Sequence, residues 1–168
     1  MRIVPRWEVK MEKFTFFWDG PFSQWDPSPF GIQGQAYNCA EQWMMEQKAI
    51  FFKDEDARRR IMSTLSPRDQ KAIGRKVRGF DPEAWDAVSR CIVYHGNVAK
   101  FNQNPSHKKA LLATAGTTIV EASPYDQIWG IGLAEGDPRA FNRKTWRGRN
   151  WLGEVLTALR EDYLSGRA

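Results

Sequence analysis

The chain has 168 residues, of which 42% are hydrophobic and 27% charged, which is typical of one compact soluble domain with a sizeable core. A net charge of +5 and a pI of about 9.4 favour anionic partners such as phosphates or nucleic acid, although scattered lysines and arginines are equally typical of a solvated surface. Because no apolar run approaches the roughly 20 residues of a membrane span and the N-terminus lacks the apolar segment of a signal peptide, we expect a cytoplasmic protein.

Cap, turn and periodicity signals predict a mainly α-helical single domain with a few short strands at residues 14–164, between an N-terminal extension at 1–13 and a tail at 165–168. The first predicted elements are a strand at 13–18, a loop at 19–35 and a helix at 39–53 capped by Asn38. Three more helices follow: 55–64 capped by Asp54, 66–76 capped by Ser66, and one capped by Asp81 that runs to Asn102. The last elements are a helix at 104–116 closed by Gly116, a strand at 117–122, an irregular segment at 123–150 and a helix at 151–164. The two long irregular segments are the predicted walls of a site.

Tryptophan is unusually frequent, with eight in the chain. A buried indole N–H needs a hydrogen-bond partner, so this number indicates either a large aromatic core or a pocket that stacks planar rings. Trp25 lies among the turn residues of the loop at 19–35, where core packing does not obviously require a large ring.

No metal or cofactor site is indicated. The two cysteines, Cys39 and Cys91, are not at metal-ligand spacing, and there are only two histidines. The sequence also lacks the glycine-rich GxGxxG and GxxxxGK[ST] loops and the GxSxG nucleophile elbow. We therefore expect chemistry that relies on carboxylates, lysines and aromatic rings.

The stretch AEQWMMEQKA, residues 40–49, places an acid and an amine on one helix face. At 100° per residue, Glu41 and Lys48 share a face with two methionines, and apolar residues also occupy the opposite face. Burial on both sides would raise the pKa of the carboxyl and lower that of the amine, which suits catalysis near neutral pH. The alternative is that each side chain pairs with another charge at the edge of the helix.

A second pattern, PYDQIWGIG at 124–132, combines Asp126 and Trp129 with two glycines. The glycines would allow the backbone to approach a ligand, Trp129 could stack on a base, and Asp126 could bind hydroxyls or assist proton transfer. The alternative is a turn with a core tryptophan.

A third pattern, WRGRNWLG at 146–153, places arginines before a helix. Asn150 is a plausible N-cap, and Arg149 beside a helix N-terminus could bind phosphate, with Arg75 adding charge. The alternative is a capped helix with surface arginines. Together the three patterns suit cleavage of an N-glycosidic bond, in which an acid protonates the departing base and a carboxylate stabilises the oxocarbenium-like sugar.

Five stretches resemble the YbiA-like, or NADAR (NAD- and ADP-ribose-associated), superfamily in family order. They are SQWDPSPF, AYNCAEQWMMEQKAIFF, AWDAVSRCIVYHGNVAKFNQNP, LLATAGTTIVEASPYDQIWGIG and RGRNWLGEVLTALR, and the resemblance covers about residues 14–164. It implies a compact, mainly helical fold and N-glycosidase activity. Known members hydrolyse ribosylamino-pyrimidine phosphates of riboflavin synthesis or remove ADP-ribose from guanine in nucleic acid.

The resemblance also implies roles for particular residues. Glu41 matches the catalytic glutamate and Lys48 the motif lysine, while Gln24 stands where some members carry asparagine. The positions associated with the pocket or its motifs are Trp25, Trp85, Asp126, Trp129 and Asn150. Lys48 could bind phosphate or form a Schiff base with the opened ribose, and the sequence does not decide between the two.

The predicted function is hydrolysis of a ribosyl–base bond in a phosphorylated nucleotide-like substrate, either a metabolite or an ADP-ribosylated guanine in DNA or RNA. Two alternatives use the same features. One is a module that binds ADP-ribose or an NAD derivative without cleaving it, and the other is a basic nucleic-acid-binding domain whose affinity falls steeply with salt.

Overall fold

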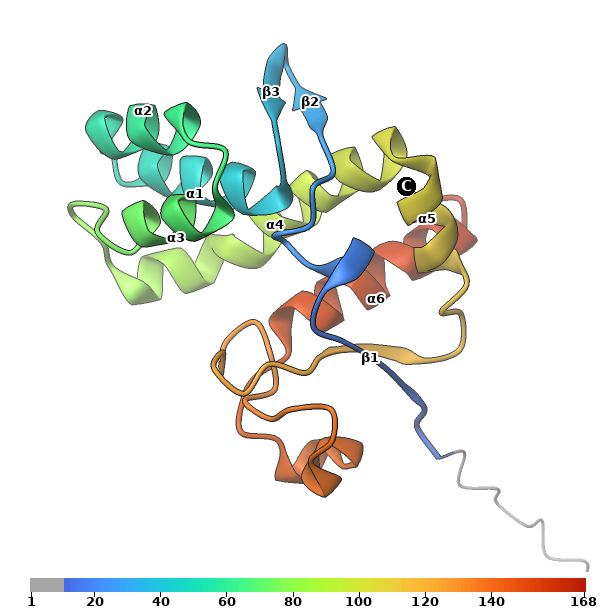
Figure 1. Cartoon of the computed structure of the whole chain (residues 1–168). Coiled ribbons are helices and arrows are strands. Elements are labelled where there is room, and N and C mark those ends of the chain that lie inside the picture. Colours follow the sequence, from blue (N-terminus) through green and yellow to red (C-terminus); the bar gives the residue numbers. More distant parts are fainter. Residues whose placement is uncertain (1–10) are drawn as a thin grey trace, which may run out of the picture.

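The computed structural model describes residues 11–168, so most of the predicted N-terminal extension at 1–13 lies outside it (Figure 1). Within residues 11–168 the chain forms six α-helices, four short strands and three 3-10 turns, which confirms the mainly α prediction. The helices are α1 (Ala40–Phe51), α2 (Glu55–Ser63), α3 (Pro67–Gly74), α4 (Pro82–Gln103), α5 (Pro105–Leu112) and α6 (Trp151–Leu164). The strands are β1 (Phe14–Phe17), β2 (Phe30–Ile32), β3 (Gln35–Tyr37) and β4 (Thr118–Glu121).

Local caps start three of the helices where the sequence predicts them. The side chains of Asp54, Ser66 and Asp81 each accept a hydrogen bond from a backbone N–H of the first helical turn. The predicted Asn38 cap is wrong, because α1 begins after Cys39. The Asn38 amide instead donates to the Leu65 carbonyl oxygen at 2.7 Å and accepts from Gln70 at 2.9 Å, so it ties the start of α1 to the α2–α3 connection.

The end of α5 also differs from its prediction. The helix stops at Leu112, and Gly116 closes a separate turn with φ +82°. A left-handed residue cannot continue a helix, and glycine adopts this conformation without steric cost.

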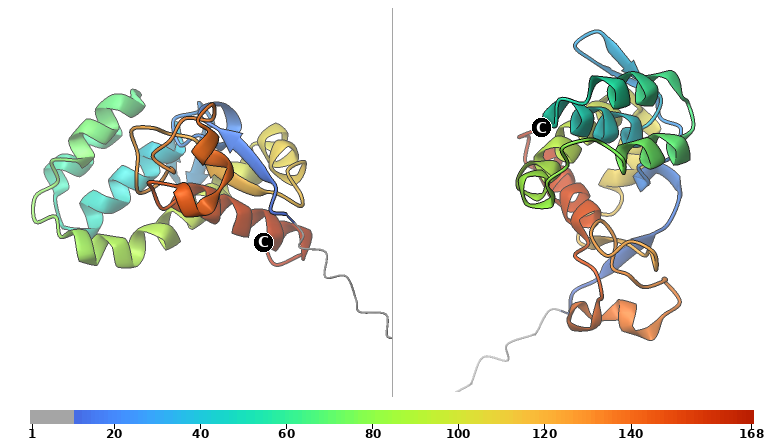
Figure 2. Two further views of the ribbon diagram at one scale, coloured as in Figure 1. Left: turned by 90° about the horizontal axis from the view of Figure 1, so that it is seen from below. Right: turned by 90° about the vertical axis from the view of Figure 1, so that its left-hand side faces the viewer.

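Strands β1 and β4, which are about 100 residues apart in the sequence, form a parallel pair. Phe14 lies opposite Thr118 and Phe17 opposite Glu121, and α6 packs against β4 (Figures 1 and 2). Parallel strands end at the same edge, so the segments that follow Phe17 and Glu121 start side by side. This pairing brings the two predicted walls of the site, 19–35 and 123–150, together.

The loop predicted at 19–35 contains regular structure that the sequence does not predict. Residues 20–22 form a 3-10 turn, and β2 pairs with β3 as an antiparallel hairpin in which the rings of Phe30 and Tyr37 stack at 5.5 Å. The hairpin turn uses Gln33 at φ +50° and Gly34 at φ +83°, the left-handed pair that a two-residue turn needs. Its strands are only three residues long, too short for a clear alternation of apolar and polar residues.

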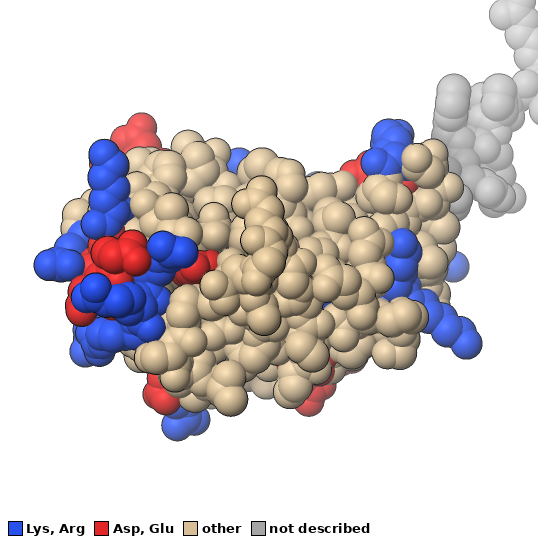
Figure 3. Space-filling model, turned by 90° about the horizontal axis from the view of Figure 1, so that it is seen from above, with Lys and Arg blue, Asp and Glu red and all other residues tan. Residues whose placement is uncertain are grey.

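Charged side chains on one face of the molecule gather at its ends (Figure 3). At the α2 end both signs occur together, because Arg58 and Arg59 pair with Glu55 and Asp56, while the middle of this face carries no charged side chain. The net charge therefore does not form one basic patch on this face. None of the helices within residues 11–168 is long and apolar enough to cross a membrane.

Candidate active site

Seven of the nine predicted site residues line one cavity of about 720 Å³, here called the main chamber. It lies between α1, α3, the start of α4, the loop at 125–129 and the start of α6. The seven are Glu41, Lys48, Arg75, Trp85, Asp126, Trp129 and Arg149. Of the other two, Trp25 lines an adjoining cavity of about 360 Å³, the side chamber, and Asn150 lies outside both linings.

Glu41 is a buried acid with a perturbed pKa. It lies in the first turn of α1, its backbone N–H donates to the Gln24 carbonyl oxygen at 2.9 Å, and it is only 5% exposed. Burial raises the pKa of its carboxyl from the ordinary 4.5 to about 7, against the opposing effects of Lys71 and the Trp25 indole N–H. A group with this pKa can both donate and accept a proton near neutral pH.

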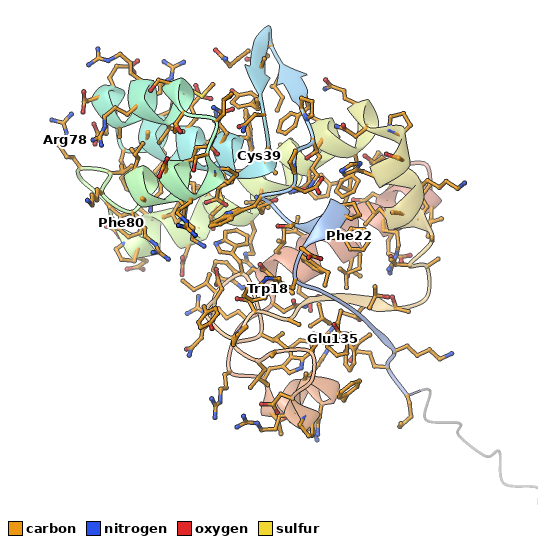
Figure 4. All side chains as sticks on the ribbon, viewed as in Figure 1. Trp18, Phe22, Cys39, Arg78, Phe80 and Glu135 are labelled. Carbon is orange, nitrogen blue, oxygen red and sulfur yellow. The ribbon has the colours of Figure 1, made fainter. Side chains whose placement is uncertain are left out.

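Lys48 is a buried amine on the same face of α1. Its Nζ lies 3.9 Å from the centre of the Phe80 ring and 5.9 Å from that of Trp85 (Phe80 is labelled in Figure 4). Burial lowers the pKa of the amine, while the Glu41 carboxylate acts in the opposite direction. No carboxylate within residues 11–168 forms an ion pair with Lys48, so its amine stays available for a ligand.

Asp126 organises the loop that closes the chamber. One carboxylate oxygen accepts the backbone N–H groups of Ile128 and Trp129, at 2.9 and 2.8 Å, and the other lies 3.7 Å from Lys71 Nζ. The following Gly130 meets the protein's own chain, since a Cβ there would lie 3.0 Å from the carbonyl oxygens of Asp126 and Glu121. The protein's own packing therefore accounts for this glycine, and the approach of a ligand to the backbone here stays a prediction.

Two charged residues at the centre of the site have no local signal in the sequence. Lys71 projects from α3 between the two chambers, and Glu121 is the last residue of β4. Burial raises the pKa of Glu121 to about 8, with Asp126 raising it further and Lys71 opposing. Its Oε2 atom is buried without a hydrogen-bond partner among the described residues. Glu41 also raises the pKa of Glu121, although the two residues lie far apart in the chain, so sequence spacing could not reveal the pair.

Asn150 supports the site from behind. It precedes α6 in a left-handed conformation, φ +55°, but its side chain does not cap the helix as predicted. Its Oδ1 accepts the Glu121 N–H and its Nδ2 donates to the Ile119 carbonyl oxygen, both at 3.0 Å. The residue is fully buried, so its amide fastens α6 to β4 and holds Glu121 in place.

Arg149 lines the main chamber and also forms an ion pair with another residue of the protein. Its Nη1 lies 3.1 Å from an Asp86 carboxylate oxygen, and its guanidinium lies 5.0 Å from the Trp151 ring centre.

Tryptophans line both chambers, which agrees with the pocket interpretation of their frequency. The five that do so are Trp18, Trp25, Trp85, Trp129 and Trp151. Within the described residues, no group of three or more His, Cys, Asp or Glu side chains is arranged to hold a metal ion.

Comparisons with known proteins place this geometry in context. The NADAR domain matches residues 15–163. The chain is 44% identical over 146 residues to the mimivirus protein N-glycosidase R617, covering 84% of this chain and 86% of that one. It is 30% identical to N-glycosidase YbiA of Shigella flexneri serotype 5b, covering 84% and 80%. It is also 36% identical to an Arabidopsis thaliana chloroplastic riboflavin biosynthesis protein, PYRR, over 67% of this chain but only 18% of that protein. The NMR structure of Escherichia coli YbiA superposes with a TM-score of 0.76 at 26% identity, covering 95% and 89%.

Proposed function

The chain belongs to the NADAR domain family, and from that premise we propose that it is an N-glycosidase that hydrolyses the ribosyl–base bond of a phosphorylated nucleotide-like substrate. The observation that carries this proposal is the presence, in one chamber, of a buried carboxyl whose pKa is about 7 and a buried amine that forms no ion pair with a carboxylate of residues 11–168. Binding alone does not require an acid poised to exchange its proton at neutral pH.

The basic side chains of the main chamber suit the phosphate end of the substrate. Arg75 and Arg149 lie in its lining with Lys48, and arginine guanidinium groups form paired hydrogen bonds to phosphate oxygens. Trp85 is only 6% exposed and contacts Phe52, so its role is to wall the chamber rather than to stack on a base. Trp129 closes the wall on the side of the loop.

The proposed reaction breaks the bond between C1′ of the ribose and the base nitrogen. The bonding electrons go to that nitrogen, which takes a proton from Glu41, and Asp126 stabilises the positive charge that develops on the sugar. Water then adds its oxygen to C1′ and returns a proton to Glu41. The products are the base and the phosphorylated sugar with a hydroxyl at C1′, and no oxidant or reductant is needed.

Lys48 supports a covalent variant of this route. Its neutral amine would bond to C1′ as the base leaves, and ring opening with protonation of the ring oxygen would leave a Schiff base. Water would release the aldehyde and restore the amine. If Lys48 instead binds phosphate as an ammonium, then Lys48→Arg should keep substrate binding and turnover.

Cleavage of the ribosyl–base bond is the direct test. The protein is incubated with DNA that carries ADP-ribosylated guanosine and, separately, with a ribosylamino-pyrimidine phosphate. We expect free ADP-ribose from the DNA or free pyrimidine base from the ribosylamino-pyrimidine phosphate, and loss of that product in Glu41→Gln. Tight binding of both substrates without any release would contradict the proposal and favour a binding module.

Borohydride trapping tests the covalent variant. We expect a stable adduct with the wild-type protein, none with Lys48→Ala or Lys48→Arg, and an unchanged yield with Lys76→Ala, which removes an exposed lysine outside both chambers. An adduct that persists without Lys48 would rule out this amine as the nucleophile.

A further inference from the structure

The side chamber is a second cavity rimmed by exposed aromatic rings. Trp18 is 51% exposed, Trp25 41% and Tyr125 88%, and the rings of Trp18 and Tyr125 meet edge to face at 6.0 Å (Trp18 is labelled in Figure 4). Large rings left half open to solvent around one cavity provide faces on which a planar ligand can stack.

The polar lining of this chamber includes a buried group with spare hydrogen-bonding capacity. The Gln24 amide oxygen already accepts from Asn97 at 3.0 Å, and the Ser123 hydroxyl accepts the Tyr125 N–H at 3.3 Å. Glu121, by contrast, has a buried oxygen with no partner among the described residues. Because its pKa is about 8, the Glu121 carboxyl is protonated at neutral pH and can donate a hydrogen bond to a ring nitrogen or carbonyl of a neutral ligand.

The two chambers differ in charge and meet at one boundary. Lys48 and Arg149 line the main chamber alone, as do Glu41 and Asp86, whereas the charged residues that line only the side chamber are Glu121 and Asp19. The residues common to both are Lys71, Arg75, Tyr125 and Asp126. The basic side chains outside this boundary thus lie in the main chamber only, which favours an anionic group there and a neutral one in the side chamber.

We propose that the side chamber is the binding subsite for the nitrogen heterocycle that leaves in the reaction, an amino-substituted pyrimidinone or purinone ring. The ring stacks on Trp18 and Trp25 and forms a hydrogen bond with Glu121, and the bond to be cleaved crosses the boundary beside Asp126. The assignment of the base to the side chamber and the phosphate to the main chamber rests on the proposed function. Binding of the ring can nevertheless be measured without any turnover.

Two soluble fragments test the subsite by calorimetry. Isocytosine represents the heterocycle and ribose 5-phosphate the other half of the substrate. We expect both to bind the wild-type protein at the same time, with the affinity of each changed by less than threefold when the other is saturating. Competition between them, or no binding of isocytosine at millimolar concentration, overturns the proposal.

Variants then assign the fragments to their chambers. Trp18→Ala should weaken isocytosine about tenfold, as expected for a lost stacking face, and leave ribose 5-phosphate affinity unchanged, which also shows that the protein is folded. Glu121→Ala should weaken isocytosine, and Glu121→Gln, which still donates and accepts, should restore its affinity. Phe141→Ala removes another exposed ring, outside both chambers, and serves as the matched control.

Equal isocytosine affinity in the wild-type protein, Trp18→Ala and Glu121→Ala would refute the subsite. A protein that binds both fragments as expected yet releases no base from either substrate would instead contradict the proposed function and leave the subsite intact. The two failures are therefore distinguishable.

Discussion

Replacing Glu41 by glutamine should stabilise the protein at alkaline pH while it removes activity. The pKa of this carboxyl rises from 4.5 to about 7 on folding, so the folded protein holds the proton more tightly than the unfolded chain does. The contribution of this carboxyl to the free energy of unfolding is therefore fully present below pH 4.5 and is lost as the pH rises through about 7. Because one unit of pKa corresponds to about 1.4 kcal/mol, ionising Glu41 costs the folded state about 3 kcal/mol at pH 8.5.

The assay is urea unfolding followed by tryptophan fluorescence at pH 5 and pH 8.5. Glu41→Gln lacks the ionisable group, so its free energy of unfolding relative to wild type should rise by about 3 kcal/mol between these pH values, roughly 6–12 °C in Tm. Glu135→Gln alters an exposed glutamate (labelled in Figure 4) and should show no such change. If the Glu41→Gln difference stays within about 1 kcal/mol at both pH values, the carboxyl is not desolvated as the structure indicates.

Three further predictions concern the pH profile and the scaffold. Base release by the wild-type protein should decline as the pH rises above about 7, because Glu41 then lacks the proton it donates; a rate that keeps rising to pH 9 would exclude this role. Asn150→Ala leaves the Ile119 carbonyl and the Glu121 N–H unpaired, and urea unfolding should show a loss of about 2–4 kcal/mol. Gly153→Ala would bring a Cβ within 2.1 Å of the Ile119 carbonyl oxygen and should lower Tm clearly. Gly136→Ala should not, because no atom of residues 11–168 would lie within 4 Å of its Cβ.

The sequence predicts best what depends on neighbouring residues. Asp54, Ser66 and Asp81 act through hydrogen bonds to the next turn of chain, so their helix starts are readable from local order. Asn38 and Asn150 show the same residue type before a helix, but their amides bind segments about 30 residues away. From the sequence alone, an asparagine before a helix that binds a distant segment cannot be distinguished from one that caps the helix.

The same distinction separates the site residues. Glu41 and Lys48 share a helix face, so helical periodicity alone brings them together. Glu121 ends an apolar strand, and nothing near it in sequence indicates that a lysine and two further carboxylates surround it. Its perturbation arises from contacts that only the tertiary fold creates, which is why the side chamber could not be predicted.

The pairing of β1 with β4 also determines when the site can exist during synthesis. A ribosome that has released the first 110 residues has already delivered α1 with its acid and amine, but β1 then has no neighbouring strand. The loop that carries Asp126, and the helix that fastens β4, emerge later still. Closing so long a segment is slow compared with forming local helices. The nascent chain should therefore acquire its helices early and its catalytic competence only near the end of translation.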